Sequence, residues 1–335
     1  MSVLRVNGGR PLRGEITVRG AKNLVPKAMV ASLLSVEPSR LASVPDIRDV
    51  EVVSGLLALH GVKVDFDKGE GVLEMDPGKL RNASVEDVDK HAGSSRIPIL
   101  LCGPLLHRLG EAQIPNLGGC HIGERPVDFH LNTLRAFGAV IEERFGGIHL
   151  SAPRGLTGTK VELPYPSVGA TEQTLLTAVR ARGITELRGA AVEPEIMDLV
   201  AILQKMGAII SVDTDRVIRV EGVEELHGYT HRAMPDRIEA ASWASAALAT
   251  DGDIFVRGAQ QADMMTFLNT FRKVGGRLDI AEDGIRFRRD TGGLRSIVLE
   301  TNVHPGFMTD WQQPLGVALT QAEGLSIVHE TVYEN

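Results

Sequence analysis

The feature that most constrains the fold is a sequence pattern that recurs four times along the chain. In each copy, apolar residues follow one another at helical spacing until a glycine ends the run, and a strand-like run comes next. The closing glycines are separated by 77, 69 and 68 residues, and they are Gly61, Gly138, Gly207 and Gly275. A regular period predicts repeated units that bury their apolar faces against one another.

Each copy also contains a short strand before this helix and, in most copies, a second apolar helix before the strand. The strands are alternating runs such as "GITELRGA" and "GDIFVRGA", and a fifth one, "GLSIVHET", begins at Gly324. The earlier helices include "TEQTLLTAVRARG", "RIEAASWASAALATDG" and "DWQQPLGVALTQAEG". The sequence therefore predicts an α/β fold of repeated units, each with two helices and several strands.

Composition narrows the class of protein. The chain has 335 residues, which is enough for about two domains with a large core. Its net charge of −7 argues against a nucleic-acid partner, and its apolar runs are too short to cross a membrane. Two cysteines cannot form a disulfide framework, and the N-terminus lacks the apolar stretch of a signal peptide. We therefore expect a cytoplasmic protein that binds neither nucleic acid nor membrane.

One copy departs from the repeat by a longer connection between its strand and its helix. This connection takes 17 residues from Gly110 to Val127, whereas the other three copies take 11 to 13. The extra residues include the stretch "PNLGGCHIGERPVDFH", residues 115–130. A lengthened connection is either a neutral surface insertion or a place where function is added, and its length alone leaves both interpretations open.

The inserted stretch has the chemistry of an anion site. Pro126 suits the first position of a helix, which we expect to span about residues 126–137. The positive end of that helix and the guanidinium of Arg125 favour a bound anion, and the same field favours the thiolate of Cys120. The second cysteine, Cys102, lies in the apolar run "ILLCGPLL" and is expected to be a small apolar filler.

Four other places combine polar or charged residues with a predicted helix start. Lys22 and Asn23 form a turn, "GAKN", before a helix, and Arg96 stands at the head of an apolar helix, where a cation opposes the helix dipole. The turn "PSVGATE", residues 166–172, enters another helix and favours an anion. Asp310 begins a helix, where N-capping would explain it without any function.

Several common site types are absent from the sequence. It contains no CxxC and no HExxH pattern, so we expect no metal. It contains no Walker loop, no GxGxxG after a strand and no GxSxG, and we expect no cofactor.

The fifth copy of the repeat has its strand, and the last residue, Asn335, stands where its helix should begin. A strand without its covering helix would leave apolar surface exposed. We therefore expect that about one further repeat, or another chain, completes the fold.

Taken together, the motifs resemble one enzyme family along essentially the whole chain. They are, in order, "GAKN", the Gly-Gly-Cys loop that runs into "RPVDFH", "PSVGAT", "EPEI", "PDRIEA" and "TDWQQP…ETVYEN". This order is similar to that of the UDP-N-acetylglucosamine 1-carboxyvinyltransferases, the enolpyruvyl transferases that start peptidoglycan precursor synthesis and that fosfomycin inhibits.

The resemblance implies an inside-out α/β barrel of repeated two-helix, multi-strand units in two domains. Residues 22–234 would form the loop-bearing catalytic domain. Residues 1–21 plus 235–335 would form a discontinuous second domain, whose C-terminal part, about one repeat, is missing. The resemblance further implies a monomer when the protein is full length.

The resemblance also implies a reaction and its residues. An enolpyruvyl group would pass from phosphoenolpyruvate to the 3-hydroxyl of UDP-N-acetylglucosamine, through a tetrahedral intermediate that loses phosphate. The implied catalytic residues are Cys120 and Asp310. The implied phosphoenolpyruvate-binding residues are Lys22, Arg96 and Arg125. The implied UDP-N-acetylglucosamine-binding residues are Asn23, Arg125, Pro126, Val127, Asp128, Phe129, Ser167, Val168, Gly169, Asp310, Val332 and Tyr333.

Two alternatives remain beside this reaction. The first is an enolpyruvyl transferase that acts on another nucleotide, and the second is a catalytically silent paralogue that binds sugar nucleotides. The resemblance also places arginines that clamp the donor beyond Asn335, so we expect a chain that ends there to bind weakly and turn over little.

Overall fold

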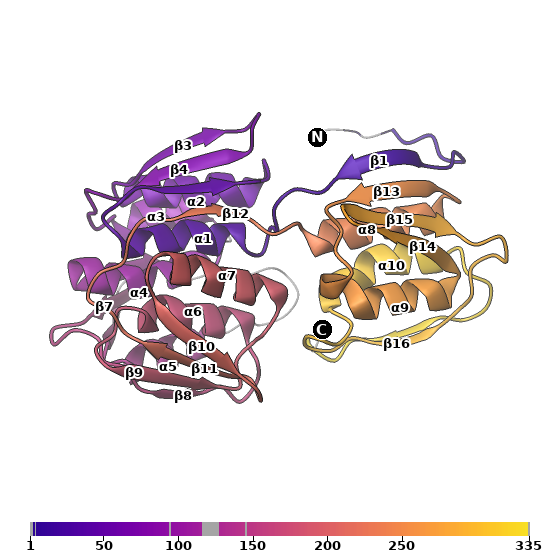
Figure 1. Ribbon diagram of the computed structural model, residues 1–335. Coiled ribbons are helices and arrows are strands. Elements are labelled where there is room, and N and C mark those ends of the chain that lie inside the picture. Colours follow the sequence, from indigo (N-terminus) through magenta and orange to yellow (C-terminus); the bar gives the residue numbers. More distant parts are fainter. Residues whose placement is uncertain (1–2, 4, 94, 116–126, 145, 334–335) are drawn as a thin grey trace. The chain divides into compact units, whose positions relative to one another are not determined.

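The computed structural model describes residues 3, 5–93, 95–115, 127–144 and 146–333. The chain divides into two compact units (Figure 1). The small unit comprises Met1–Arg19 and Pro235–Glu334, and the large unit comprises Gly20–Met234. The chain therefore passes from the small unit into the large unit and back again.

The large unit carries three copies of the repeat. Its helices are α1 (Val25–Ala31), α2 (Arg48–Leu59), α3 (Val85–Ala92), α4 (Pro98–Leu109), α5 (Asp128–Ala136), α6 (Val168–Ala178) and α7 (Pro194–Lys205). Its strands are β2 (Ser39–Ala42), β3 (Lys63–Asp67), β4 (Val72–Asp76), β5 (Glu111–Pro115), β6 (Val140–Arg144), β7 (Gly147–Ser151), β8 (Lys160–Glu162), β9 (Ile184–Arg188), β10 (Ile209–Asp213), β11 (Val217–Glu221) and β12 (Thr230–Arg232).

The strands of the large unit form three separate sheets, in the orders β12-β2-β4-β3, β5-β7-β6 and β10-β11-β9-β8. The pair β8 and β9 is parallel and is joined by α6, which is the crossover that a parallel pair requires. The pairs β9–β11 and β10–β11 are antiparallel. Each of the three sheets contains an antiparallel hairpin, and two of them also contain a parallel pair, β12–β2 and β8–β9.

Within the large unit, the helices form the interior and the sheets form the outer layer. Figure 1 shows α1, α6 and α7 between the sheet that contains β3 and β4 and the sheet that contains β8 to β11. Every residue of α6 from Ala170 to Ala178 is buried, whereas β4 buries only alternate residues. A helix buried on all sides needs an apolar or internally bonded surface all round, as α6 and α4 have. The repeated α/β units that the sequence predicted, and the inside-out arrangement that the family resemblance implied, are confirmed.

The repeat glycines end the second helix of each copy, as predicted. Gly61, Gly138, Gly207 and Gly275 follow the ends of α2, α5, α7 and α9, and their φ angles lie between +89° and +111°. A residue with a side chain is strained in this left-handed region, so the helix stop selects glycine. The period in the sequence therefore reflects one backbone turn that is built four times.

The small unit carries the remaining copies. Its elements are β1 (Arg13–Thr17), α8 (Arg237–Ala249), β13 (Asp253–Arg257), α9 (Met265–Val274), β14 (Gly276–Ala281), β15 (Gly284–Arg289), β16 (Val298–Glu300), α10 (Gln312–Leu319) and β17 (Ile327–His329), with a short 3-10 helix at Thr309–Trp311. The sheets have the orders β1-β13-β15-β14 and β16-β17. Five aromatic rings pack in a chain of contacts in the core, namely those of Phe267, Phe271, Phe287, Phe307 and Trp311.

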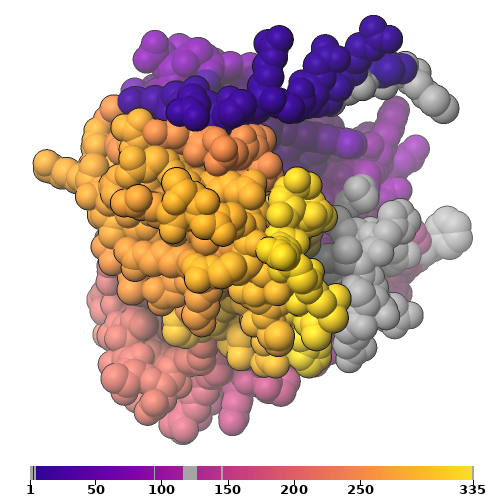
Figure 2. Space-filling model, turned by 90° about the vertical axis from the view of Figure 1, so that its right-hand side faces the viewer, coloured from indigo at the N-terminus to yellow at the C-terminus, as the bar shows by residue number. Residues whose placement is uncertain are grey.

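The strand of the fifth repeat copy is β17, which pairs in parallel with β16 and is exposed on the surface of the small unit. Figure 2 shows the segment from the C-terminal region on the outside of this unit. Large apolar side chains are exposed there, including Val298 at 79% and Leu325 at 78%. Across the described part of the chain, none of the helices combines the length and the apolar character that a membrane crossing needs.

Candidate active site

The first turn of α6 forms one side of the candidate site. Ser167 is its N-cap, and the Ser167 hydroxyl accepts a hydrogen bond of 3.3 Å from the Ala170 N–H. Val168 and Gly169 are the first two residues of the helix, where backbone N–H groups have no acceptor within the helix. This end of α6 therefore presents N–H donors and the positive end of a helix dipole, which suits a phosphate.

The start of α5 packs beside the start of α6. Val127 is the N-cap of α5, and the helix begins at Asp128, close to the expected start at about residue 126; Pro126 itself lies outside the described residues. The Leu131 N–H donates a hydrogen bond of 3.0 Å to the Val127 carbonyl. A methyl group at Gly169 would lie 2.9 Å from His130, which shows how closely the two helices approach.

Arg96 precedes α4 and lies near the start of α5. Burial, followed by the positive charge of Arg96, lowers the pKa of His130 to about 4. His130 is therefore neutral at neutral pH, and Arg96 supplies the positive charge of this region. In the sequence, His130 falls at one of the helical positions of the repeat that are otherwise apolar. A polar residue at an apolar position of that repeat was the signal that could have identified it.

Lys22 and Asn23 lie in a tight turn before α1. The N–H groups of Leu24 and Val25 both donate to the Ala21 carbonyl at 3.0 Å, which closes the turn. Lys22 Nζ lies 3.6 Å from Asp49 Oδ2, and 61% of the Lys22 side chain is exposed. An exposed ion pair of this kind contributes little stability, so an anionic ligand can compete with Asp49 for the ammonium.

The remaining candidate residues lie in the small unit. Asp310 is exposed and occupies the 3-10 helix Thr309–Trp311, which leads into α10. Neither that helix nor α10 has a side-chain N-cap, so the N-capping explanation for Asp310 is wrong. The neighbouring Trp311 is buried, and the Arg237 guanidinium lies 5.3 Å from the centre of its ring. Asp310 is thus an exposed carboxylate on a firmly anchored turn.

Glu330 organises the backbone around Val332 and Tyr333. Its carboxylate accepts hydrogen bonds from the Val332 N–H at 2.6 Å, the Tyr333 N–H at 3.2 Å and the Thr309 hydroxyl at 3.2 Å. Partial burial acts to raise the pKa of Glu330, but these bonds and one from Thr301 lower it below its usual range. One carboxylate therefore ties the turn that carries Asp310 to the segment that carries Val332 and Tyr333.

Sequence reasoning missed Glu330, although it begins the quoted motif "ETVYEN". The signal that could have found it is a carboxylate directly before a short polar turn, where backbone N–H groups need acceptors. Each unit thus assembles its own part of the candidate site. The large unit holds Lys22, Asn23, Arg96, Val127, Asp128, Phe129, Ser167, Val168 and Gly169, and the small unit holds Asp310, Val332 and Tyr333.

Three predicted site residues, Cys120, Arg125 and Pro126, lie outside the described residues, and their roles stay predictions. The other cysteine, Cys102, is completely buried in α4, and burial raises the pKa of its thiol. Cys102 is therefore the structural cysteine that the apolar run predicted, because a buried neutral thiol is neither accessible nor reactive.

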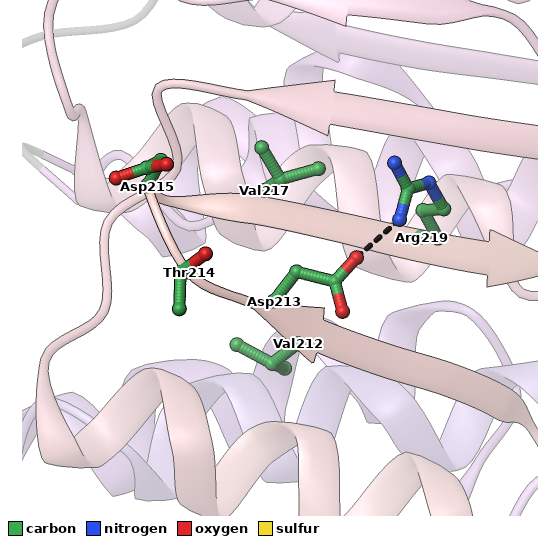
Figure 3. A pocket seen from close by; sticks show the side chains of 6 residues that line it. All are labelled: Val212, Asp213, Thr214, Asp215, Val217 and Arg219. Atoms are coloured by element: carbon green, nitrogen blue, oxygen red, sulfur yellow. Dashed lines mark hydrogen bonds and ion pairs between the residues drawn. The ribbon is translucent and has the colours of Figure 1, made fainter.

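The described residues include one surface hollow that holds none of the candidate site residues. It lies at the hairpin between β10 and β11 and is lined by Val212, Asp213, Thr214, Asp215, Val217 and Arg219 (Figure 3). Arg219 forms an ion pair with Asp213 across it. Within the described ranges, no cluster of three or more His, Cys, Asp or Glu side chains could hold a metal ion.

A buried ion pair lies behind the turn of Lys22 and Asn23. Glu172 of α6 is 4% exposed, and its Oε1 lies 3.3 Å from Lys27 Nζ of α1. Burial raises the pKa of Glu172 from 4.5 to about 7, with Lys27 acting in the opposite direction and Glu193 and Glu195 acting to raise it further. Glu172 is therefore the buried acid whose ionisation changes near neutral pH.

This shift predicts a pH dependence of stability. The native state binds the Glu172 proton more tightly than the unfolded state does, so the resulting stabilisation is present below pH 4.5 and is lost as the pH rises through about 7. Relative to Glu172→Gln, the unsubstituted protein should lose about 2 kcal/mol of unfolding free energy between about pH 5.5 and about pH 8. Urea unfolding of both proteins at the two pH values measures this difference.

The matched control is Glu186→Gln. Hydrogen bonds from Arg188 and Arg219 lower the pKa of Glu186, so that carboxylate stays ionised across the same window. Its replacement should therefore change the unfolding free energy equally at both pH values. A difference between the unsubstituted protein and Glu172→Gln that does not vary with pH would contradict the assigned shift.

Comparison with known proteins identifies relatives along the whole chain. The family model described as EPSP synthase (3-phosphoshikimate 1-carboxyvinyltransferase) matches residues 6–335. A UDP-N-acetylglucosamine 1-carboxyvinyltransferase of Protochlamydia amoebophila is 50% identical over 100% of this chain and 73% of its own length. A UDP-N-acetylglucosamine 1-carboxyvinyltransferase 1 of Staphylococcus aureus is 41% identical over 100% of this chain and 79% of its own length.

Two solved structures share the fold. The enolpyruvyl transferase NikO from Streptomyces tendae superimposes with a TM-score of 0.87 at 22% identity, over 98% of this chain and 77% of that one. An EPSP synthase from Acinetobacter baumannii superimposes with a TM-score of 0.68 at 18% identity, over 96% of this chain and 74% of that one. At these identities the structures establish the fold alone.

Proposed function

The chain belongs to the EPSP synthase family, and its curated relatives are named UDP-N-acetylglucosamine 1-carboxyvinyltransferase. We propose that the chain is an enolpyruvyl transferase with the substrates that this name states. It transfers the enolpyruvyl group of phosphoenolpyruvate to the 3-hydroxyl of UDP-N-acetylglucosamine and releases phosphate. The observation that carries this proposal is the 50% identity to a relative of that name over the entire chain.

The chemistry has two stages. In the first, the sugar hydroxyl oxygen bonds to C2 of phosphoenolpyruvate, the hydroxyl loses its proton and C3 gains one, which gives a tetrahedral intermediate that still bears phosphate. In the second, C3 loses a proton and the bond from C2 to the phosphate oxygen breaks. We assign Asp310 as the base for the hydroxyl and Cys120 as the thiol that assists proton addition and product release.

The large unit supports the binding roles in this scheme. Phosphoenolpyruvate is multiply anionic, and we assign its phosphate to Lys22 and Arg125 with Arg96 nearby. We assign the first turn of α6 at Ser167–Gly169 and the start of α5 to the nucleotide side, because a helix N-terminus suits a diphosphate. We assign Asn23, Asp310, Val332 and Tyr333 to the sugar side.

The reaction has a cellular consequence. We infer a cytoplasmic enzyme of peptidoglycan precursor synthesis, on which cell shape and division depend. Fosfomycin then inhibits it by alkylating Cys120. The same chemistry on another nucleotide acceptor, and sugar-nucleotide binding without turnover, are the two competing functions.

Phosphate release with a panel of acceptors separates these functions. The protein is assayed at the full length of its curated relatives, of which this chain spans 73% to 79% in the two cases described. With phosphoenolpyruvate present, we expect release in the presence of UDP-N-acetylglucosamine and none with UMP, free N-acetylglucosamine or shikimate 3-phosphate. Release with a different acceptor alone would favour the enzyme with another nucleotide specificity. Calorimetric binding of UDP-N-acetylglucosamine without any phosphate release would favour the silent paralogue.

A further inference from the structure

Lys27 stands where its own helix does not favour it. It is the third residue of α1, and α1 has no acidic residue in its first turn and no side-chain N-cap. A cation in the first turn of a helix opposes the helix dipole. Its side chain is nevertheless only 14% exposed, so the ammonium depends on specific partners rather than on water.

The partners of Lys27 lie on two sides. Nζ donates a hydrogen bond of 2.7 Å to the Asn23 carbonyl, which belongs to the turn that presents Lys22 and Asn23. Nζ also lies 3.3 Å from Oε1 of Glu172. One ammonium group therefore connects the Lys22–Asn23 turn to the body of α6.

The α6 end of this connection is rigid. Glu172 directly follows the first helical turn, which begins at Val168 and carries the N–H groups assigned to the nucleotide. The Thr171 hydroxyl donates to the Ser167 carbonyl at 2.8 Å and accepts from the Ala191 N–H at 2.9 Å, which fixes that turn to the segment before α7. A shift of Lys27 would therefore move the Lys22–Asn23 turn relative to an α6 turn that stays fixed.

We propose that Lys27 and Glu172 form a positioning pair that holds the Lys22–Asn23 turn in register with the first turn of α6. Resting on the proposed function, the pair sets the distance between the residues assigned to the donor phosphate and the sugar and those assigned to the nucleotide. Lys27 and Glu172 are positioning residues, because they act through the Asn23 carbonyl and the α6 backbone.

The energetics favour a positional role over a stabilising one. A buried ion pair contributes little net stability, because the cost of removing two charges from water offsets their attraction. Here Glu193 and Glu195 add negative charge near Glu172, which makes the ionised carboxylate still more costly. Two apolar side chains would fill the same space at a lower desolvation cost, but neither could donate a hydrogen bond to the Asn23 carbonyl.

The test compares Lys27→Met, Lys27→Arg and Glu172→Gln, with Lys68→Met as the matched control. Lys68 also forms an ion pair, with Asp46 at 2.8 Å, but its side chain is 63% exposed and it contacts no candidate site residue. Each variant is assayed for kcat and KM with phosphoenolpyruvate. Amide hydrogen exchange is measured at Leu24 and Val25, whose N–H groups close the turn.

Lys27→Met should lower kcat/KM for phosphoenolpyruvate by about tenfold, mainly through KM, because a misplaced ligand group costs binding and orientation together. Exchange at Leu24 and Val25 should rise by about tenfold. Lys27→Arg should recover most of both losses, because it keeps a charged donor. Glu172→Gln should have a smaller effect, because Lys27 still reaches the Asn23 carbonyl, and Lys68→Met should match the unsubstituted protein.

The exchange measurement keeps this proposal separate from the proposed function. If the unsubstituted protein releases no phosphate, the proposed function fails, and exchange at Leu24 and Val25 still decides whether Lys27 positions the turn. If Lys27→Met lowers only the unfolding free energy and leaves exchange and kcat/KM unchanged, the positioning role is overturned. If Lys27→Met does not fold, equal exchange in Lys27→Arg, Glu172→Gln and Lys68→Met overturns it, whereas a graded increase in Glu172→Gln supports it.

Discussion

Replacing Asp310 with asparagine is expected to lower kcat for phosphate release by about 10²- to 10⁴-fold, the range over which a positioned general base acts. Asparagine has nearly the same shape as aspartate and still accepts hydrogen bonds, but it cannot take the proton of the sugar hydroxyl. The structure supports this assignment, because Asp310 is exposed and caps neither of the helices that begin around it. A steady-state phosphate assay at saturating substrates measures the loss.

Two measurements separate this loss from a loss of folding. The control Asp290→Asn changes another aspartate of the small unit, which is partly exposed and whose carboxylate accepts from the Thr291 N–H at 2.9 Å, and it should retain full kcat. Asp310→Asn should also keep the melting temperature of the unsubstituted protein. A kcat for Asp310→Asn within about twofold of the unsubstituted value would remove Asp310 from the role of general base.

Replacing Cys120 with serine is expected to lower kcat by at least about 10²-fold, because a hydroxyl is a far weaker acid than a thiol. Cys120→Asp should retain more activity than Cys120→Ser, because a carboxyl group can also deliver a proton. Its pH–rate profile should shift to lower pH, since the ordinary pKa of a carboxyl lies below that of a thiol. The pH–rate profiles of the two variants and the unsubstituted protein measure both effects.

Cys102 supplies the matched control for this experiment. It is completely buried, and its Sγ lies 3.8 Å from the Pro98 carbonyl, which a serine hydroxyl could also reach. Cys102→Ser should keep its activity, and fosfomycin should label Cys120 but not Cys102 in a mass-spectrometric map. Full activity in Cys120→Ser, or labelling at Cys102, would contradict the assignment of the reactive thiol.

The fold follows from the sequence because one local rule recurs. Each copy of the repeat closes its second helix with a glycine at positive φ, and that single requirement is visible in Gly61, Gly138, Gly207 and Gly275. The burial of α6 on all sides also follows from its composition, since its sequence contains apolar and small polar residues and one acid. Patterns of this kind are local, and local patterns are what a sequence displays most directly.

The parts of the site that escaped prediction depend on contacts between distant residues. Lys27 and Glu172 read as ordinary charged helix residues, and only the packing of α1 against α6 makes them a buried pair. Glu330 escaped because its role depends on Thr309 and on the backbone of Val332 and Tyr333. Proline fixes the start of α5 only approximately, because it suits the first helical position wherever it occurs, and the described helix begins at Asp128.

The central claim is that this chain builds an enolpyruvyl ether at the sugar 3-hydroxyl. The most direct measurement is a reaction of the protein with phosphoenolpyruvate and UDP-N-acetylglucosamine, followed together by phosphate assay and by NMR of the nucleotide product. The account predicts one phosphate for each nucleotide that gains an enolpyruvyl group on its 3-oxygen. Phosphate release without that product, or an enolpyruvyl group at a different oxygen, would contradict it.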